Sequence, residues 1–214
     1  MHNAFLNIDN KKMSKSLGNF FTVREISEKY DLQVLRFFML SAHYRSPLNF
    51  SADLMEASKN GLERILTGME KLREMEAKVS GDAMTAEEQE NQKKAMELVA
   101  KYEAAMDDDF NTADAISAIF ELIKLSNSTV SETSTKAYVS WMKNEIQRLC
   151  DVMGIITEKK KEVLDSEVED LIAQRQAARK AKNFALADEI RGKLLSRPFL
   201  EASIKSALKF NGLL

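Results

Sequence analysis

The sequence has few of the residues that cross-link or interrupt a chain. Its 214 residues include one cysteine, two prolines, seven glycines and one tryptophan. One cysteine excludes an internal disulfide framework, and this scarcity fits a reducing, cytoplasmic setting. No apolar run approaches the length of a bilayer span, and the N-terminus lacks the basic-then-apolar layout of a signal peptide. We therefore expect neither a disulfide-rich secreted domain nor a membrane protein.

Composition instead favours a folded, mainly α protein. Charged residues make up 30% and hydrophobic residues 44% of the chain, a balance that excludes a disordered chain. The length is sufficient for one sizeable core or two smaller ones. Long stretches of Ala, Glu, Lys, Leu and Met, with almost no proline, predict helices nearly throughout.

The apolar pattern divides the chain into a short strand, short helices and four long helices. Only residues 4–8 alternate as a strand does. Thr22 with Glu25 forms a capping box before a brief helix, and Asp31 caps the next one. Thr85 with Glu88 forms another capping box farther along the chain. Four helical stretches with polar linkers follow within residues 54–153 and predict an antiparallel bundle. The residues expected to face the core include Phe38, Met39, Leu54, Met69, Met96, Val99, Tyr102, Ile119, Met142, Leu149 and Met153.

A compact set of hydrogen-bond donors lies near the N-terminus, in the run Lys12-Met13-Ser14-Lys15-Ser16. Two ammonium groups three positions apart and two hydroxyls, with Gly18 behind them, suit a polyphosphate. When a nucleoside triphosphate loses pyrophosphate, mobile lysines on a short loop can stabilise the charge that builds on the leaving oxygens. These five residues in this order are expected by chance in roughly one chain of this length in ten thousand. The run predicts a nucleotide-phosphate loop, and the alternative is a solvated basic turn.

The same run resembles the second signature, KMSKS, of class I aminoacyl-tRNA synthetases. Its surroundings are similar to cysteinyl-tRNA synthetase in four segments, residues 1–5, 17–22, 41–50 and 106–112. The resemblance continues in one register from residue 1 to about residue 195. It implies that Lys12 and Lys15 are catalytic and that Met13, Ser14 and Ser16 bind ATP with them, with Mg²⁺ accompanying ATP in the intact enzyme. Met13 would anchor the loop on an apolar surface.

Other chemical elements of that family have no counterpart in this sequence. There is no Gly-x-Gly-x-x-Gly run and no His-x-Gly-His-like segment. Zinc is expected in the family and needs about four ligands, whereas Cys150, His2 and His43 lie far apart in this chain, so its ligands are absent. We interpret the chain as the C-terminal portion of a synthetase, from the KMSKS loop onward and without the N-terminal nucleotide-binding domain. By itself it is not expected to aminoacylate.

Two further clusters allow more than one interpretation. Residues 107–109 are three aspartates that could hold magnesium, but Asp109 and Asn111 also stand where a helix N-terminus needs caps, which we favour. Residues 43–45, His-Tyr-Arg, offer a ring and a guanidinium to RNA, yet the resemblance places them at the junction of the catalytic unit and the bundle. Cys150 lies on an apolar helix face and is expected to pack in the core.

Positive charge is concentrated toward the C-terminal end. Residues 171–214 contain nine basic and three acidic residues, an excess of six, although the whole chain has a net charge of −2. Two helices are expected here, one from Ser166 to about Lys182 and one from Phe184 to about Ser196, the second capped by Asn183. A basic helix pair suits nucleic acid, while charge alone fits a solvated surface equally well.

The resemblance favours RNA. Residues 179–191 are similar to the element by which bacterial cysteinyl-tRNA synthetases grip the anticodon, which usually carries Trp where Phe184 stands. The similarity implies that Phe184 stacks on a base, that Arg179 and Asp188 bond base edges, and that Arg191 completes the contact. Residues 197–214 lack the Asp-Thr-Pro-x-Gly-Thr-x-Trp-like stretch of the family. We therefore expect anticodon recognition to be incomplete.

The sequence thus predicts three regions: a KMSKS loop and stem-contact region (1–50), a helical bundle (51–156) and a basic anticodon-binding region (157–214). The expected function is the C-terminal part of a cysteine–tRNA ligase, which activates cysteine with ATP and transfers it to tRNA(Cys). Its expected partners are tRNA(Cys), ATP and, in the intact enzyme, cysteine. Two alternatives stay open: a synthetase-like ligase that joins cysteine to an amino sugar in mycothiol synthesis, and a noncatalytic helical RNA-binding protein.

Overall fold

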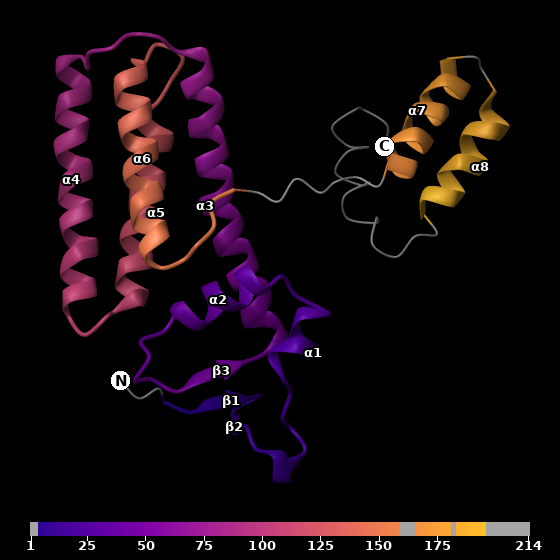
Figure 1. Ribbon diagram of the computed structural model, residues 1–214, viewed down its shortest axis with the longest axis horizontal. Helices are drawn as coiled ribbons and strands as arrows, with labels where there is room; N and C mark the ends of the chain where they lie inside the picture. The colour runs from indigo at the N-terminus through magenta and orange to yellow at the C-terminus, as the bar shows by residue number, and fades with distance from the viewer. Residues whose placement is uncertain (1–3, 159–165, 181–182, 196–214) are drawn as a thin grey trace. The chain divides into compact units, whose positions relative to one another are not determined.

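The computed structural model describes residues 4–158, 166–180 and 183–195. The chain forms two compact units, residues 1–159 and 160–214. The first unit contains a small sheet, two short α-helices and four long helices (Figure 1). The prediction of a mainly α fold is confirmed. None of the helices in the described part of the chain combines the length and the apolar character needed to cross a membrane.

The sheet has three short strands in the order β2-β1-β3: β1 is Leu6–Ile8, β2 is Lys11–Lys12 and β3 is Leu48–Phe50. β1 and β2 form an antiparallel hairpin, and β1 pairs in parallel with β3. The hairpin turn places Asp9 and Asn10 at φ 48° and 65°, which are the left-handed angles of a two-residue turn and are tolerated well by these two residue types. The predicted strand at residues 4–8 is confirmed over its last three residues.

Two short helices follow the loop after β2. α1 is Val23–Ser27 and α2 is Leu32–Leu40. The predicted capping box is present, because the Thr22 hydroxyl accepts from the Glu25 amide at 3.3 Å and the Glu25 carboxylate accepts from the Thr22 amide at 2.6 Å. The carboxylate of Asp31 accepts from the Gln33 amide at 2.8 Å, as expected of the second cap.

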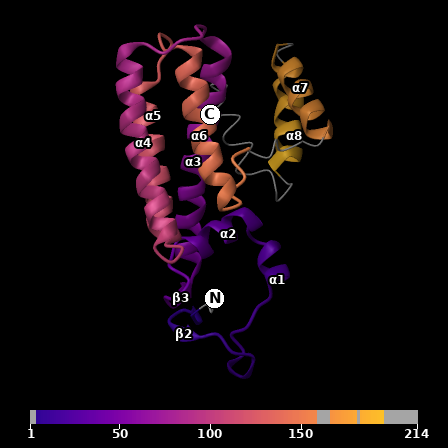
Figure 2. The same ribbon diagram turned by 60° about the vertical axis from the view of Figure 1, so that its left-hand side comes forward.

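Four long helices make the predicted bundle, and Figures 1 and 2 both show them side by side. They are α3 (Ala52–Lys78), α4 (Ala86–Asp107), α5 (Thr112–Thr129) and α6 (Lys136–Val152). Each begins at a side chain that accepts a hydrogen bond from an amide of its own first turn; these side chains belong to Ser51, Thr85, Asn111 and Thr135. The sequence places a cap at every bundle helix, so each start is specified locally.

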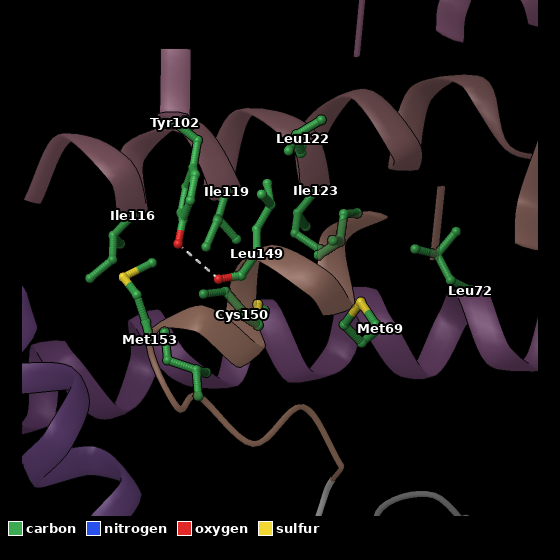
Figure 3. Packing of buried hydrophobic residues seen from close by; sticks show 14 of the residues in the cluster. Met69, Leu72, Tyr102, Ile116, Ile119, Leu122, Ile123, Leu149, Cys150 and Met153 are labelled. Atoms are coloured by element: carbon green, nitrogen blue, oxygen red, sulfur yellow. Dashed lines mark hydrogen bonds between the residues drawn. The ribbon is translucent and has the colours of Figure 1, made fainter. Parts of the chain in front are cut away.

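The bundle core is mainly apolar, and one of its polar contacts joins α4 to α6. Met69 and Met142 are fully buried, as predicted for the methionine-rich stripe. Tyr102 donates its hydroxyl hydrogen to the backbone carbonyl of Leu149 at 3.0 Å (Figure 3). Burial raises the pKa of Tyr102 to about 12 and that of the Cys150 thiol also to about 12. Cys150 is therefore a packing residue, as predicted, and its thiol stays protonated at neutral pH.

Three residues expected in the core are exposed instead. Met39, Leu54 and Met96 are 44%, 43% and 48% exposed. Each follows or precedes by one position a buried residue of the same helix, namely Phe38, Met55 and Ala95. One residue is about 100° of helix rotation, which carries a side chain from the buried stripe to its solvent edge. The prediction therefore made the buried stripe of these helices too wide, but it placed the helices correctly.

One carboxylate joins the starts of two bundle helices. Glu88 closes the predicted capping box of α4 by accepting from the Thr85 amide at 2.8 Å. It also accepts from the amide and the hydroxyl of Thr135, the cap of α6, at 2.7 and 2.8 Å. Desolvation pushes the pKa of Glu88 upward, but the hydrogen bonds from Thr135 and Thr85 outweigh it and the pKa is lowered. Glu88 thus links α4 to α6, and its ionised form makes this link stronger.

The second unit contains a helix pair, α7 (Ser166–Lys180) and α8 (Phe184–Leu195). The pair confirms the predicted helices as far as the described residues reach, because Lys182 and residues 196–214 lie outside them. Asn183 caps α8 as predicted, since its side-chain oxygen accepts from the Leu186 amide at 3.2 Å. Ala178, Ala187 and Ile190 are buried. Small side chains let the two helices approach closely.

We expect Glu88→Gln to lower the free energy of unfolding by about 1–3 kcal/mol at pH 7, because buried donors lose a charged acceptor. Since the pKa of Glu88 is lowered, its stabilisation is present above the ordinary value of 4.5 and is lost as the pH falls through the folded value. The variant should lack this part of the acid sensitivity. Urea unfolding from pH 7 to pH 3 measures both effects, and the exposed neighbour change Glu87→Gln should stay within about 0.5 kcal/mol of the parent. Equal losses in both variants would contradict the linkage.

Candidate functional site

The KMSKS loop is held at both ends by short-range bonds. At its start the Met13 amide donates to the Leu6 carbonyl at 2.9 Å, which continues the β1–β2 hairpin. The side chain of Asn19 then crosses the loop: its oxygen accepts from the Ser14 amide at 2.9 Å, and its NH₂ donates to the Lys12 carbonyl at 3.2 Å. Asn19 therefore closes the loop on itself.

Between these ties the chain makes one tight turn, the 3₁₀ helix η1 (Lys15–Leu17). Gly18 ends it at φ 68° and donates its amide hydrogen to the Lys15 carbonyl at 3.2 Å. A Cβ at Gly18 would meet no atom within 4 Å, so it is the left-handed backbone angle that favours glycine here. The hydroxyls of Ser14 and Ser16 lie 2.7 Å apart and form one polar group.

The ammonium groups of the loop lie over aromatic rings. Lys12 Nζ is 4.1 Å from the centre of the Phe5 ring, and Lys15 Nζ is 5.2 Å from that of Phe20. Within the part of the chain that the structure describes, neither lysine forms an ion pair. A ring attracts a cation without neutralising it, so both charges stay available to an anion. Met13 and Ser14 are half-buried, whereas Lys12, Lys15 and Ser16 are exposed.

Three further residues shape this loop and were not predicted from the sequence to do so: Asn19, Phe5 and Phe20. Their roles depend on contacts made across the turn, and no spacing rule signals an asparagine that bonds backward by five and seven residues. The short helix α1 begins three residues after Phe20, and its capping box gives the only local signal of where the loop ends.

The predicted RNA-contact residues all lie on the α7–α8 pair. Arg179 is exposed near the end of α7, and Phe184, Asp188 and Arg191 are exposed on α8. Positions 184, 188 and 191 follow the i, i+4, i+7 spacing of one helix face. Phe184 is 62% exposed, although it begins the helix directly after its cap. The structure thus supports one accessible face that carries an aromatic ring, a carboxylate and a guanidinium.

The aspartate cluster at residues 107–109 makes different contacts from those predicted. Asp109 does not cap α5, because Asn111 does so by accepting from the Asp114 amide at 3.3 Å. The Asp109 carboxylate instead accepts from the Tyr44 hydroxyl at 2.8 Å and pairs with Arg45 Nε at 3.0 Å. Because Asn111 supplies the cap of α5, the Asp109 carboxylate is left to bind these two side chains.

The donor set does not fit zinc. Among the described residues no group of three or more His, Cys, Asp or Glu side chains is placed to hold a metal ion. Cys150, the only cysteine of the chain, is buried in the bundle core, and His43 is stacked on Tyr44 with ring centres 4.8 Å apart. His2 lies outside the described residues. We assign no step to zinc in this chain.

Two family models match the sequence. Residues 1–60 match the class I (C) tRNA synthetase catalytic domain, and residues 101–157 match the DALR domain. The first range holds the sheet, the KMSKS loop and the start of α3, and the second holds α5, α6 and the end of α4. The class of protein that these matches define is the class I tRNA synthetases.

Two relatives are similar along almost the whole chain. The cysteine–tRNA ligase of Lachnospira eligens is 56% identical over 211 residues, which are 99% of this chain and 45% of the relative. The cysteine–tRNA ligase of Lachnoclostridium phytofermentans is 53% identical over 98% of this chain and 46% of the relative. The chain is thus similar along nearly its whole length to part of the cysteine–tRNA ligases, and it spans about half the length of these curated relatives.

A solved structure shares the fold. The chain is similar to the crystal structure of the ternary complex of Agrobacterium radiobacter K84 agnB2 LeuRS-tRNA-LeuAMS, with a TM-score of 0.57 and 16% identity. The match covers 78% of this chain and 24% of that chain. At this identity the likeness concerns the fold alone.

We expect Asn19→Ala to open the KMSKS loop. Loss of its hydrogen bonds should cost about 1 kcal/mol, which corresponds to roughly fivefold faster hydrogen exchange at the Ser14 amide. Amide exchange followed by NMR measures the rate. The matched change Ser16→Ala removes only the hydroxyl contact with Ser14, so it should leave that amide unchanged. Parent-like exchange in Asn19→Ala would show that the asparagine does not hold the loop.

Proposed function

We propose that this chain provides the ATP-phosphate loop and the tRNA-binding helices of a cysteine–tRNA ligase. In the intact enzyme, cysteine and ATP give cysteinyl-adenylate and pyrophosphate, and the cysteinyl group then moves to the terminal ribose of tRNA(Cys). The observation that carries the proposal is the pair of exposed ammonium groups of Lys12 and Lys15, which form no ion pair with any described residue and lie on a loop closed at both ends. The family relationship supports the same assignment.

Lys12 and Lys15 would act in the first step. As the bond between the α-phosphate and the pyrophosphate breaks, negative charge moves onto the leaving oxygens, and two nearby ammonium groups stabilise it. The Ser14 and Ser16 hydroxyls donate further hydrogen bonds, and Met13, half-buried, anchors the loop. The contacts of both lysines with aromatic rings are weak, about 0.5–1 kcal/mol at an exposed site. A triphosphate can therefore draw the ammonium groups away from the rings.

Mg²⁺ is proposed as a companion of ATP in the intact enzyme, where it would neutralise phosphate charge. No carboxylate of the KMSKS loop is available to hold it, since the run from Lys11 to Phe21 contains no Asp or Glu. We therefore assign no residue of this chain to the metal. We likewise assign no residue of this chain to the recognition of cysteine.

The tRNA contact is proposed for Arg179, Phe184, Asp188 and Arg191. Their shared exposure supports it, since an accessible ring can stack on a splayed base while the guanidinium groups reach phosphate or base edges. The excess of six positive charges after residue 170 adds a non-specific attraction. Within this proposal, residues 1–50 belong to the catalytic unit, 51–156 form the bundle, and 157–214 contact the anticodon. A cytoplasmic location fits the single, buried cysteine.

We expect Lys15→Ala to weaken binding of tripolyphosphate and of Mg-ATP to this chain about tenfold, because a charged hydrogen bond is removed. Isothermal calorimetry at low salt measures both ligands. Lys11→Ala is the matched control, since Lys11 is an exposed lysine of the adjacent strand outside the signature. The control should lose no more than about twofold, through general charge alone. Equal losses in the two variants would leave only a basic surface and reject the phosphate-loop assignment.

A second variant tests the RNA face. We expect Phe184→Ala to reduce the preference for a tRNA with a GCA anticodon over one with a changed anticodon by about 1–3 kcal/mol, the contribution of one stacked base. Filter binding at two salt concentrations separates this preference from phosphate contacts, which salt weakens steeply. Leu186→Ala, also exposed on α8, is the control and should keep the preference. Parent and both variants binding the two tRNAs equally would refute anticodon recognition by these helices.

A further inference from the structure

A charged cluster joins the bundle to the segment that follows α2, although its members are separated by about 65 positions in sequence. The carboxylate of Asp109, in the turn between α4 and α5, accepts from the Tyr44 hydroxyl at 2.8 Å and forms an ion pair with Arg45, whose Nε lies 3.0 Å away. Arg45 Nε donates to the Tyr44 hydroxyl oxygen at 3.0 Å, and His43 Nε2 is 3.7 Å from the carboxylate. We call these four residues the Asp109 latch.

The turn that carries the latch has an unusual backbone. Asp109 and Phe110 are consecutive non-glycine residues at φ 54° and 56°. Left-handed angles are uncommon for such residues and persist where the surrounding contacts over-determine them. The Phe110 amide donates to the Met106 carbonyl at 3.1 Å, and the Asn111 amide donates to the Ala105 carbonyl at 3.0 Å, which together reverse the chain here. The reversal holds the Asp109 carboxylate toward Tyr44.

From the latch a short series of bonds leads to the KMSKS loop. The carbonyl of Tyr44 accepts from the amide of Ala4 at 2.8 Å, directly before Phe5. The carbonyl of Phe5 accepts from the Leu48 amide at 3.1 Å, which fixes the backbone of Phe5 beside β3. The Phe5 ring lies 4.1 Å from the ammonium nitrogen of Lys12.

An open hollow of about 520 Å³ separates the sheet from the bundle along this path. Its lining includes Phe5, His43, Tyr44, Phe110 and Met153. Packing across the hollow is therefore incomplete, so side-chain contact alone does not hold the Phe5 segment against the bundle. The latch and the bond between Ala4 and Tyr44 bridge it instead.

We propose that Asp109 is a positioning residue for Lys12: through Tyr44 and the Ala4–Phe5 segment it sets where the Lys12 ammonium lies when the loop is empty. This inference rests on the proposed phosphate role of Lys12. Asp109 touches no reacting atom. The effect is expected at one of the two lysines, because Lys15 lies over Phe20, which is not part of the series of described bonds from Tyr44 to Phe5.

The docking of α2 on the bundle does not depend on the latch. The Thr112 hydroxyl, at the start of α5, donates to the Leu40 carbonyl at the end of α2 at 2.7 Å. Phe37 and Phe38 of α2 are buried in the shared core. Loss of the Asp109 side chain should therefore leave the fold intact and change the Phe5 segment locally.

Asp109→Gly tests the positioning role most directly. Glycine adopts φ 54° without a steric penalty, so the turn is retained while every contact of the Asp109 carboxylate is removed. In a proton–carbon NMR spectrum of the whole chain, the Lys12 ε-methylene should lose the upfield shift caused by the Phe5 ring. The Lys15 ε-methylene, over Phe20, should keep its shift and serves as the internal reference. The matched change Asp108→Gly, in an exposed neighbour, should alter neither signal.

Asp109→Asn adds a graded test, because the amide can still accept from the Tyr44 hydroxyl but has lost its charge for Arg45. Its Lys12 signal should lie between those of the parent and of Asp109→Gly. An unchanged Lys12 signal in folded Asp109→Gly would overturn the proposal. Equal movement of the Lys12 and Lys15 signals would also overturn it, since that marks a general structural role.

A double-mutant cycle with tripolyphosphate separates this inference from the proposed function. The factor by which Lys12→Ala weakens tripolyphosphate binding should be roughly threefold smaller in the Asp109→Gly background than in the parent. The reason is that a displaced Lys12 ammonium group already contributes less to binding. If the parent binds no tripolyphosphate, the proposed phosphate role fails while the NMR result still decides the positioning. If binding is normal and the two effects are additive, the positioning role fails and the phosphate role stands.

Discussion

The parallel pairing of β1 with β3 is the contact on which the candidate site depends. β1 leads through a tight hairpin into the KMSKS loop, and β3 leads through the Ser51 cap into α3, the longest bundle helix. Six residues, three consecutive ones from each strand, therefore connect the loop to the bundle. The Asn49 side chain reinforces this link by accepting from the Asn10 amide in the hairpin turn at 2.8 Å. A displacement of α3 would be transmitted to the loop through these bonds.

This arrangement reconciles two requirements of a phosphate loop. The backbone must stay in place so that the donors converge, while the ammonium groups must move to follow developing charge. Here Asn19 and the hairpin restrain the backbone, and long lysine side chains resting on exposed rings supply the movement. Strong ion pairs in the empty loop would have opposed the second requirement, because a triphosphate would first have to break them.

Local sequence signals predicted most of the fold. The capping boxes of Thr22 and Thr85 are where the spacing placed them, and the four bundle helices follow the apolar period. β3 and its pairing with β1 were not predicted, because three residues without clear alternation give no signal and the partner lies about 40 positions away. Asp109 was assigned to the nearest helix for the same reason: a cap is a local inference, whereas its actual partner Tyr44 is recognisable only in three dimensions.

The sequence suggests the chemistry that we propose for the site, but it did not predict the geometry of the loop. The residue types at positions 12–16 indicate phosphate whatever the surrounding fold, so the lysines could be named from sequence. The residues that hold them, Asn19 and Phe5, act through backbone bonds and ring contacts that no residue type announces. For the α7–α8 pair, the positive charge fits a nucleic-acid-binding surface and a solvent-exposed surface equally well. The resemblance favoured RNA, and the exposed face supports that choice without testing it.

The central claim is that these residues complete a cysteine–tRNA ligase, and joining the chain to the N-terminal portion of the Lachnospira eligens relative tests it most directly. The measurement is cysteine-dependent exchange of pyrophosphate into ATP, followed by transfer of cysteine to tRNA(Cys). The account predicts that the joined protein shows both activities. A folded joined protein that exchanges pyrophosphate but transfers cysteine to an amino sugar and not to tRNA(Cys), or that shows no exchange, would contradict it.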